Sequence, residues 1–133
     1  MILFQNSFID VVFHNTECVV AGIWKNTNTL DFTDEIFREC MSVWFEEIKK
    51  ITKVNVLADT RLFLFTITPE TQTWINEHII GLYPKYGVSK LGFLMSPDLF
   101  AQVSIEQTID EKAQAFQVSY FNDETEVMKW LCK

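Results

Sequence analysis

One kind of junction occurs twice in this chain: a short apolar run leads to a hydroxyl residue, a proline and an acidic residue. The run VNVLA (54–58) precedes Thr68-Pro69-Glu70, and the run KLGFLM (90–95) precedes Ser96-Pro97-Asp98. A hydroxyl side chain can cap a helix, proline suits the first helical position, and an acid there complements the helix dipole. The pattern predicts buried strands that lead into helices, which is typical of an α/β fold.

The segment before these junctions predicts a hairpin and a long helix. The runs FIDVVFH (8–14) and CVVAGIW (18–24) are β-rich and are separated by three polar residues, which indicates a β-hairpin. Over residues 33–52 a helix is expected, because large apolar residues recur there at steps of three and four. These residues are Phe37, Met41, Trp44, Ile48 and Ile51.

Three further helices are expected after the junctions and at the end of the chain. The helix that starts at Thr68 would bury Ile75, Ile79 and Leu82, and the helix after Ser96 would run through Phe100 and Val103. SIEQTIDEKAQ (104–114) would be a turn or a second helix. FQVSYF (116–121) is the expected last strand, and Asp123 with Glu126 resembles a capping box. The helix after that box would bury Val127, Trp130 and Leu131.

Together these elements predict a single domain over residues 1–133. It would be an α/β domain with an N-terminal β-hairpin and then three strand-helix units. Helices between consecutive strands require crossover connections, so most neighbouring strands should be parallel. We therefore expect a mixed, mostly parallel five-stranded sheet packed by helices.

The charge balance disfavours two classes of partner. The chain has 11 Lys and Arg against 18 Asp and Glu, a net charge of -7, and no basic cluster larger than Lys49-Lys50. Binding to a nucleic-acid backbone needs a concentrated positive face, and so does binding to an anionic membrane surface. We therefore expect no nucleic-acid partner. We also expect no membrane insertion, because the longest uncharged apolar run is far below the length of a membrane helix.

The three cysteines, Cys18, Cys40 and Cys132, are widely spaced. They give neither a disulfide framework nor a CxxC motif. The first residues lack the basic segment of a signal peptide. A cytoplasmic location is the expectation that follows. His14 and His78 are the only histidines, and we expect no metal and no other cofactor.

Asp59, Thr60 and Arg61 are the first candidate site, because they follow the run VNVLA, where open α/β sheets bind ligands. Arg61 could bind a carboxylate or phosphate group, helped by free backbone amides near Thr68. The alternative is that Asp59 pairs with Arg61 or with loop amides and only fixes the loop. No catalytic residue is assigned, since no nucleophile elbow and no glycine-rich phosphate loop occurs.

LFLF (62–65) is the second candidate. Four large apolar residues in a connection rarely face water, so they either extend the core or form an interface. The interface hypothesis is a homodimer that buries Phe63 or Phe65.

Four segments, taken in order, resemble the SpoIIAA-like family of the STAS superfamily, the anti-sigma-factor antagonist fold. They are VLADTR (ending at Arg61), TPETQTWI (68–75), LGFLMSPDLF (91–100) and YFNDETEVMKWL (120–131). The resemblance implies a domain that works by binding a protein partner or a small anionic or lipidic ligand. In the antagonist branch an Asp-Ser pair begins the helix after the central strand, and the Ser is phosphorylated. Here Ile67 and Thr68 occupy those positions, so we do not expect that switch.

Three functions remain open at this point. The first is a non-enzymatic regulatory or ligand- or protein-binding domain that uses the end of the central strand. A small carrier of lipids or hydrophobic metabolites, with an apolar pocket near residues 62–65, is the second. The third is an enzyme in which Asp59 and Arg61 are the active groups.

Overall fold

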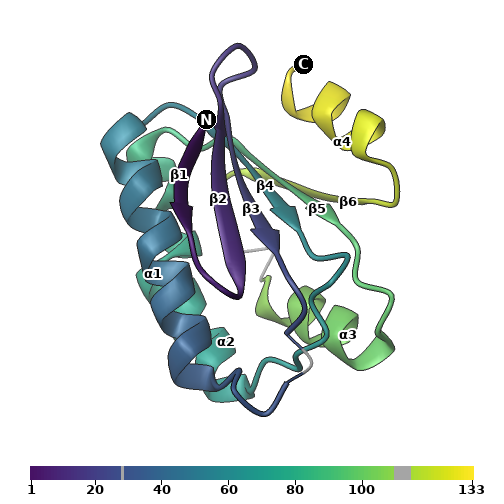
Figure 1. Cartoon of the computed structure of the whole chain (residues 1–133). Coiled ribbons are helices and arrows are strands. Elements are labelled where there is room, and N and C mark those ends of the chain that lie inside the picture. Colours follow the sequence, from purple (N-terminus) through teal and green to yellow (C-terminus); the bar gives the residue numbers. More distant parts are fainter. Residues whose placement is uncertain (28, 110–114) are drawn as a thin grey trace.

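A computed structural model describes residues 1–27, 29–109 and 115–133 of the chain (Figure 1). All strands in this part of the chain form one sheet, with the order β1-β2-β3-β4-β5-β6. The elements are β1 (Ile2–Gln5), β2 (Ile9–His14), β3 (Val19–Trp24), α1 (Asp34–Ile51), β4 (Asn55–Asp59), α2 (Pro69–His78), a 3-10 helix η1 (Ile80–Tyr86), β5 (Lys90–Leu94), α3 (Leu99–Thr108), β6 (Gln117–Phe121) and α4 (Glu124–Leu131).

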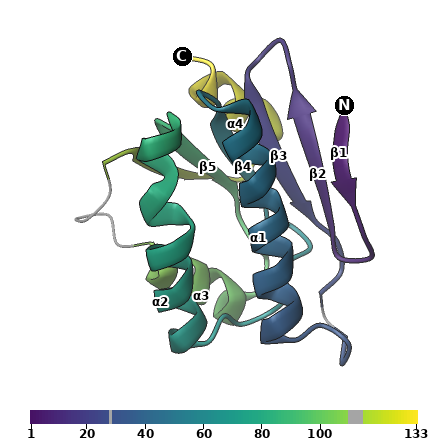
Figure 2. The ribbon, with the colours of Figure 1, turned by 90° about the vertical axis from the view of Figure 1, so that its left-hand side faces the viewer.

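The sheet is mixed. β1, β2 and β3 pair antiparallel, whereas β3, β4, β5 and β6 pair parallel. Each crossover from β3 onwards moves one strand in the same direction, so right-handed connections bring their helices to one face. Figure 2 shows α1 and α2 side by side on that face, while α4 lies on the opposite side of the sheet.

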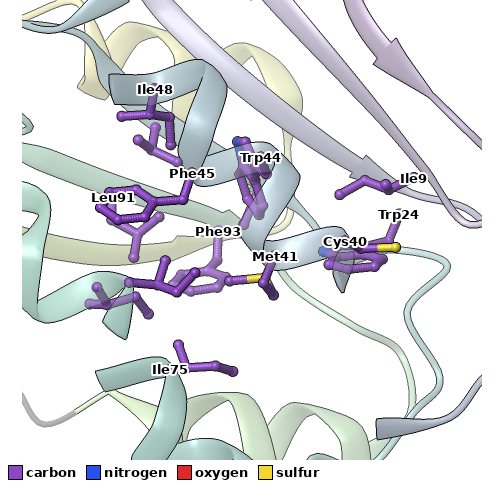
Figure 3. Packing of buried hydrophobic residues seen from close by; sticks show 14 of the residues in the cluster. Ile9, Trp24, Cys40, Met41, Trp44, Phe45, Ile48, Ile75, Leu91 and Phe93 are labelled. Carbon is purple, nitrogen blue, oxygen red and sulfur yellow. The ribbon is translucent and has the colours of Figure 1, made fainter. Parts of the chain in front are cut away.

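Two apolar clusters fill the two faces. The larger one joins α1, α2 and α3 to the sheet (Figure 3), and the smaller one packs Val127 and Leu131 of α4 against β3, β4 and β5. Glycines in β3 and β5 allow α1 and α4 to approach the sheet closely. A Cβ on Gly22 would come within 2.6 Å of the Trp44 indole, and one on Gly92 within 2.7 Å of a Val127 methyl carbon.

The α/β class and the mixed sheet are confirmed, but the predicted number of strands is wrong. The structure has a sixth strand, β1, at the edge beside β2. β1 is only four residues long, and none of its positions is buried. Because it is so short and has no buried face, its sequence lacks the alternation that identifies a strand.

The predicted helix starts are partly confirmed. Thr68 caps α2, with Pro69 at its first position. At α3 the cap is Asp98, which accepts a hydrogen bond from the Ala101 amide at 2.9 Å, and not Ser96. Asp123 occupies the cap position of α4 but makes no side-chain cap bond.

The predicted core positions are partly confirmed. Leu82 was expected to be buried but is exposed, because α2 ends at His78. Phe100 and Val103 lie on α3, as expected, and are exposed there. Ile51 and Trp130 are half-buried and pack against the two apolar clusters. Residues 110–114 of the segment 104–114 lie outside the described residues, and α3 ends at Thr108.

Candidate functional site

Asp59 ends β4 at the carboxyl edge of the parallel strands, and Thr60 follows it. Asp59 is the last residue of the strand, and Thr60 is only 3% exposed. The Thr60 amide and hydroxyl both donate to the Leu94 carbonyl at the end of β5. The hydroxyl is therefore used to join two strand ends.

Arg61 folds back onto Asp59. Its Nε lies 3.0 Å from Asp59 Oδ1 and its Nη2 lies 2.7 Å from Oδ2, while the Arg61 amide also donates to Oδ1 at 3.2 Å. Nη2 lies 3.8 Å from a carboxylate oxygen of Glu124 as well. The hydrogen bond to Asp59 holds the pKa of Arg61 above its ordinary value. This geometry matches the alternative in which Asp59 pairs with Arg61 and fixes the loop. Two carboxylates offset the positive charge of the guanidinium, which an anionic ligand would need for binding.

Thr68 lies at another place in the fold, the junction of α1 and α2. Its hydroxyl accepts from the Thr71 amide at 3.3 Å and donates to Asp34 Oδ1 at 3.3 Å. Thr71 donates to the same Asp34 oxygen at 3.1 Å and accepts from Arg38. The start of α2 is thus bound to the start of α1, and a carboxylate already lies beside it.

Phe63 belongs to the core of its own chain. It is 1% exposed and packs against Trp24, Phe32 and Phe37, with ring centroids 5.2, 6.3 and 5.4 Å away. Phe65 is half-buried, with its ring 4.9 Å from that of Phe32. Of the two alternatives for LFLF, the structure therefore places Phe63 in the core, where its ring is unavailable to a second copy.

Other apolar side chains are exposed at this edge instead. We use the name α3 patch for Leu62, Leu99, Phe100 and Val103, whose exposed fractions are 56, 70, 74 and 41%. The last three lie on α3 at spacings of one and three residues. Leu62 is in the neighbouring loop, which a 2.6 Å hydrogen bond from Ser96 Oγ to the Phe63 carbonyl joins to the start of α3.

The inner face of α3 explains why the patch is exposed. This face consists of Ala101, Ser104, Ile105 and Thr108, of which two carry hydroxyl groups. Ser104 Oγ donates to the Ala101 carbonyl at 2.8 Å, and Thr108 Oγ1 donates to the Ser104 carbonyl at 2.7 Å. Since both hydroxyls are satisfied, this face can be buried at little cost. Sequence reasoning missed the patch because it placed Phe100 and Val103 on a helix without predicting which face of that helix is buried.

An apolar cavity lies between the sheet and the helices. Its volume is about 50 Å3, and its walls include Met41, Trp44, Ile75 and Phe93, which Figure 3 shows in the space between α1, α2 and the sheet. Trp44 Nε1 is buried and has no hydrogen-bond partner among the described residues. An engineered cavity that binds benzene measures about 150 Å3, so this one is too small for an acyl chain.

Metal ligands do not gather in the described part of the chain: no group of three or more His, Cys, Asp or Glu side chains could hold an ion there. His78 is exposed and stacks on Trp74, with ring centroids 5.5 Å apart. Within the same residues, no helix combines the length and the apolar character needed to cross a membrane.

Comparison with known proteins gave no relative. No protein-family model matches the chain, and neither the curated proteins nor the solved structures contain a match.

Proposed function

We propose that this protein is a non-enzymatic binding domain of the SpoIIAA-like type, which acts through protein contacts at the carboxyl edge of its parallel strands. The contact that we propose is self-association, in which the α3 patches of two copies meet. The observation that carries this proposal is the exposure of three large apolar side chains on α3 and of a fourth, Leu62, on the loop that is hydrogen-bonded to the start of α3.

Charge favours a second copy as the occupant of the patch. In a two-fold dimer the same surface lies on both sides of the interface, so each charge lies near its own duplicate. The chain has a net charge of -7, and most of its surface would therefore repel a second copy. α3 is an exception, because Glu106 is its only charged residue.

The other two candidate functions have weaker support. Asp59 and Arg61 bind each other, so neither is a free acid, base or anion-binding group. The cavity of about 50 Å3 is far smaller than the ~300 to 1,000 Å3 of pockets that hold small ligands. A lipid could enter only if the core were to open.

Static light scattering on three proteins tests the proposal: wild type, Phe100→Ser and the control Leu30→Ser. Both substitutions remove a large exposed apolar side chain, but Leu30 belongs to the loop before α1 and is not one of the four patch residues. At one high micromolar concentration, wild type and Leu30→Ser should have a mass above that of one chain, and Phe100→Ser should have the mass of one chain. Equal masses for all three, whether of one chain or two, would overturn the proposal.

A further inference from the structure

Two cysteines that are far apart in the sequence lie close together in the fold. Cys18 ends the turn between β2 and β3, where its amide donates to the Asn15 carbonyl at 3.3 Å. Cys132 directly follows α4. The Cys132 Sγ atom lies 4.0 Å from the carbonyl oxygen of Glu17, the residue before Cys18. Figures 1 and 2 both show the end of α4 and the β2–β3 turn at the same end of the molecule.

Asn55 joins the same two segments. Its backbone amide donates to the Cys18 carbonyl at 3.0 Å, and its side-chain amide donates to the Leu131 carbonyl at 2.8 Å. Both hydrogen bonds come from the first residue of β4, which lies inside the sheet between β3 and β5. A residue of the sheet therefore binds Cys18 and Leu131, the residue before Cys132.

The contact at Glu17 limits the distance between the cysteines. In a planar peptide the carbonyl oxygen lies about 2.8 Å from the next Cα, and a cysteine Sγ lies about 2.8 Å from its own Cα, so the 4.0 Å contact keeps the two Cα atoms within about 10 Å of each other. Disulfides join Cα atoms that are ~4.4 to 6.8 Å apart, a range that lies inside this limit. Both side chains would rotate to form the bond, because Cys18 Sγ lies 3.6 Å from the Asn15 carbonyl oxygen, and the end of the chain after α4 would move toward the β2–β3 turn.

Both thiols are also accessible to a reagent. Cys18 and Cys132 are exposed, whereas Cys40 is buried. Cys132 lines a shallow surface depression together with Glu17, Met128 and Lys129. At Cys40 burial raises the pKa of the thiol, and this keeps it in the unreactive, protonated form at neutral pH.

The geometry points to a redox-modification site formed by Cys18 and Cys132, which small disulfides such as oxidised glutathione convert to an intramolecular disulfide. One thiolate attacks a sulfur of the small disulfide, which gives a mixed disulfide and releases one thiol. The second cysteine then attacks the protein sulfur of the mixed disulfide and releases the other thiol. Overall the pair loses two electrons and two protons, and the reagent becomes two thiols.

The disulfide would fix α4 to the sheet. α4 is the helix that covers the second face of the sheet, through Val127 and Leu131, and the residue directly after it would be linked covalently to the β2–β3 turn. Movement of α4 away from the sheet would be restricted in the oxidised protein. A reducing agent would restore this movement.

Peptide mass spectrometry tests the site. The native protein is treated with oxidised glutathione, its free thiols are alkylated, and it is digested with trypsin without reduction. The expected product is the peptide 1–25 disulfide-linked to the peptide 130–133, in a protein that runs as one chain on a non-reducing gel. Cys40 should remain reduced.

Three variants provide the controls. Cys40→Ser should form the same linked peptides to the same extent as wild type. Cys18→Ser and Cys132→Ser should lose them and retain glutathione on the remaining exposed cysteine. Two results would overturn the inference: glutathione retained separately on Cys18 and Cys132 in wild type, or linked peptides found only in dimers on the gel.

Discussion

Arg61 lies beside two carboxylates, and we expect its contribution to be one of stability. The Arg61 side chain is 49% exposed and the Asp59 side chain only 10%, so removing the guanidinium leaves a largely buried carboxylate with one backbone donor. We expect Arg61→Ala to lower the free energy of unfolding by about 1 kcal/mol, because solvent weakens the exposed part of the pair. Urea denaturation measures this loss.

The alternative role of Arg61, binding a small anion, predicts a different result. A ligand that binds only the folded protein raises its stability in proportion to the logarithm of its concentration. Inorganic phosphate should leave the urea midpoints of both wild type and Arg61→Ala unchanged. If phosphate stabilises wild type but not the variant, Arg61 is an anion site.

Asp10 predicts a pH dependence of stability. Its carboxylate lies 2.8 Å from Lys25 Nζ. Burial acts to raise the pKa of Asp10, but hydrogen bonds from Lys25 and Gln5 and the charge of Lys25 together lower it. A lowered pKa in the folded state stabilises the protein above the pKa of the unfolded state, about 3.9. This stabilisation is lost as the pH falls through the folded-state pKa.

We therefore expect Asp10→Asn to unfold more easily than wild type near neutral pH, by less than about 1 kcal/mol for a pair at the surface. At a pH below the folded-state pKa the two proteins should have equal stability. Urea denaturation at both pH values is the measurement, and a difference that persists or grows in acid would contradict the assignment.

The residues of the candidate site show what the sequence could and could not predict. That Asp59 pairs with Arg61 was one of two interpretations, because residues so close in sequence can meet in almost any fold. Thr68 was correctly predicted as a helix cap, since capping is local. Its position beside Asp34 could not be predicted, because it depends on how α1 packs against α2.

At the scale of elements, α3 shows a limit of hydrophobic patterns. Its outer face has Leu99, Phe100 and Val103, and its inner face has two hydroxyl residues. A hydrophobicity scale alone would assign the outer face of this helix to the core and its inner face to the solvent. The long helix α1 was predicted well because its buried face consists of large apolar residues, and here size and burial coincide.

The contact between α1 and β3 gives a prediction at the same scale. Gly22→Ala would bring a methyl group within 2.6 Å of the benzo ring of Trp44, a rigid and buried side chain. We expect it to destabilise the fold by about 1 to 3 kcal/mol, as overpacking does. Chemical denaturation gives the value.

A double mutant identifies the cause of that loss. Trp44→Phe removes the carbon atoms that the new methyl would meet, and with them an indole N–H that has no partner among the described residues. The two substitutions together should cost less than the sum of their separate costs, since neighbouring residues couple. Additive costs would show that the Gly22 backbone, and not the indole, sets the penalty.

For the whole molecule, the repeated strand-to-helix junctions were sufficient to predict the α/β class. They could not predict β1, which depends on pairing with β2 at the sheet edge, nor the approach of Cys18 to Cys132. Both features join segments whose contact is created only by the complete sheet. The same is true of the α3 patch, since exposure is a property of the assembled surface.

Sedimentation velocity of the wild-type protein, from low to high micromolar concentration, measures its self-association. If the α3 patch joins two copies, the weight-average sedimentation coefficient should rise with concentration toward the value of two chains. Phe100→Ser should keep the value of one chain throughout. A wild-type coefficient that stays at the value of one chain over the whole range would show that the α3 patch does not join two copies.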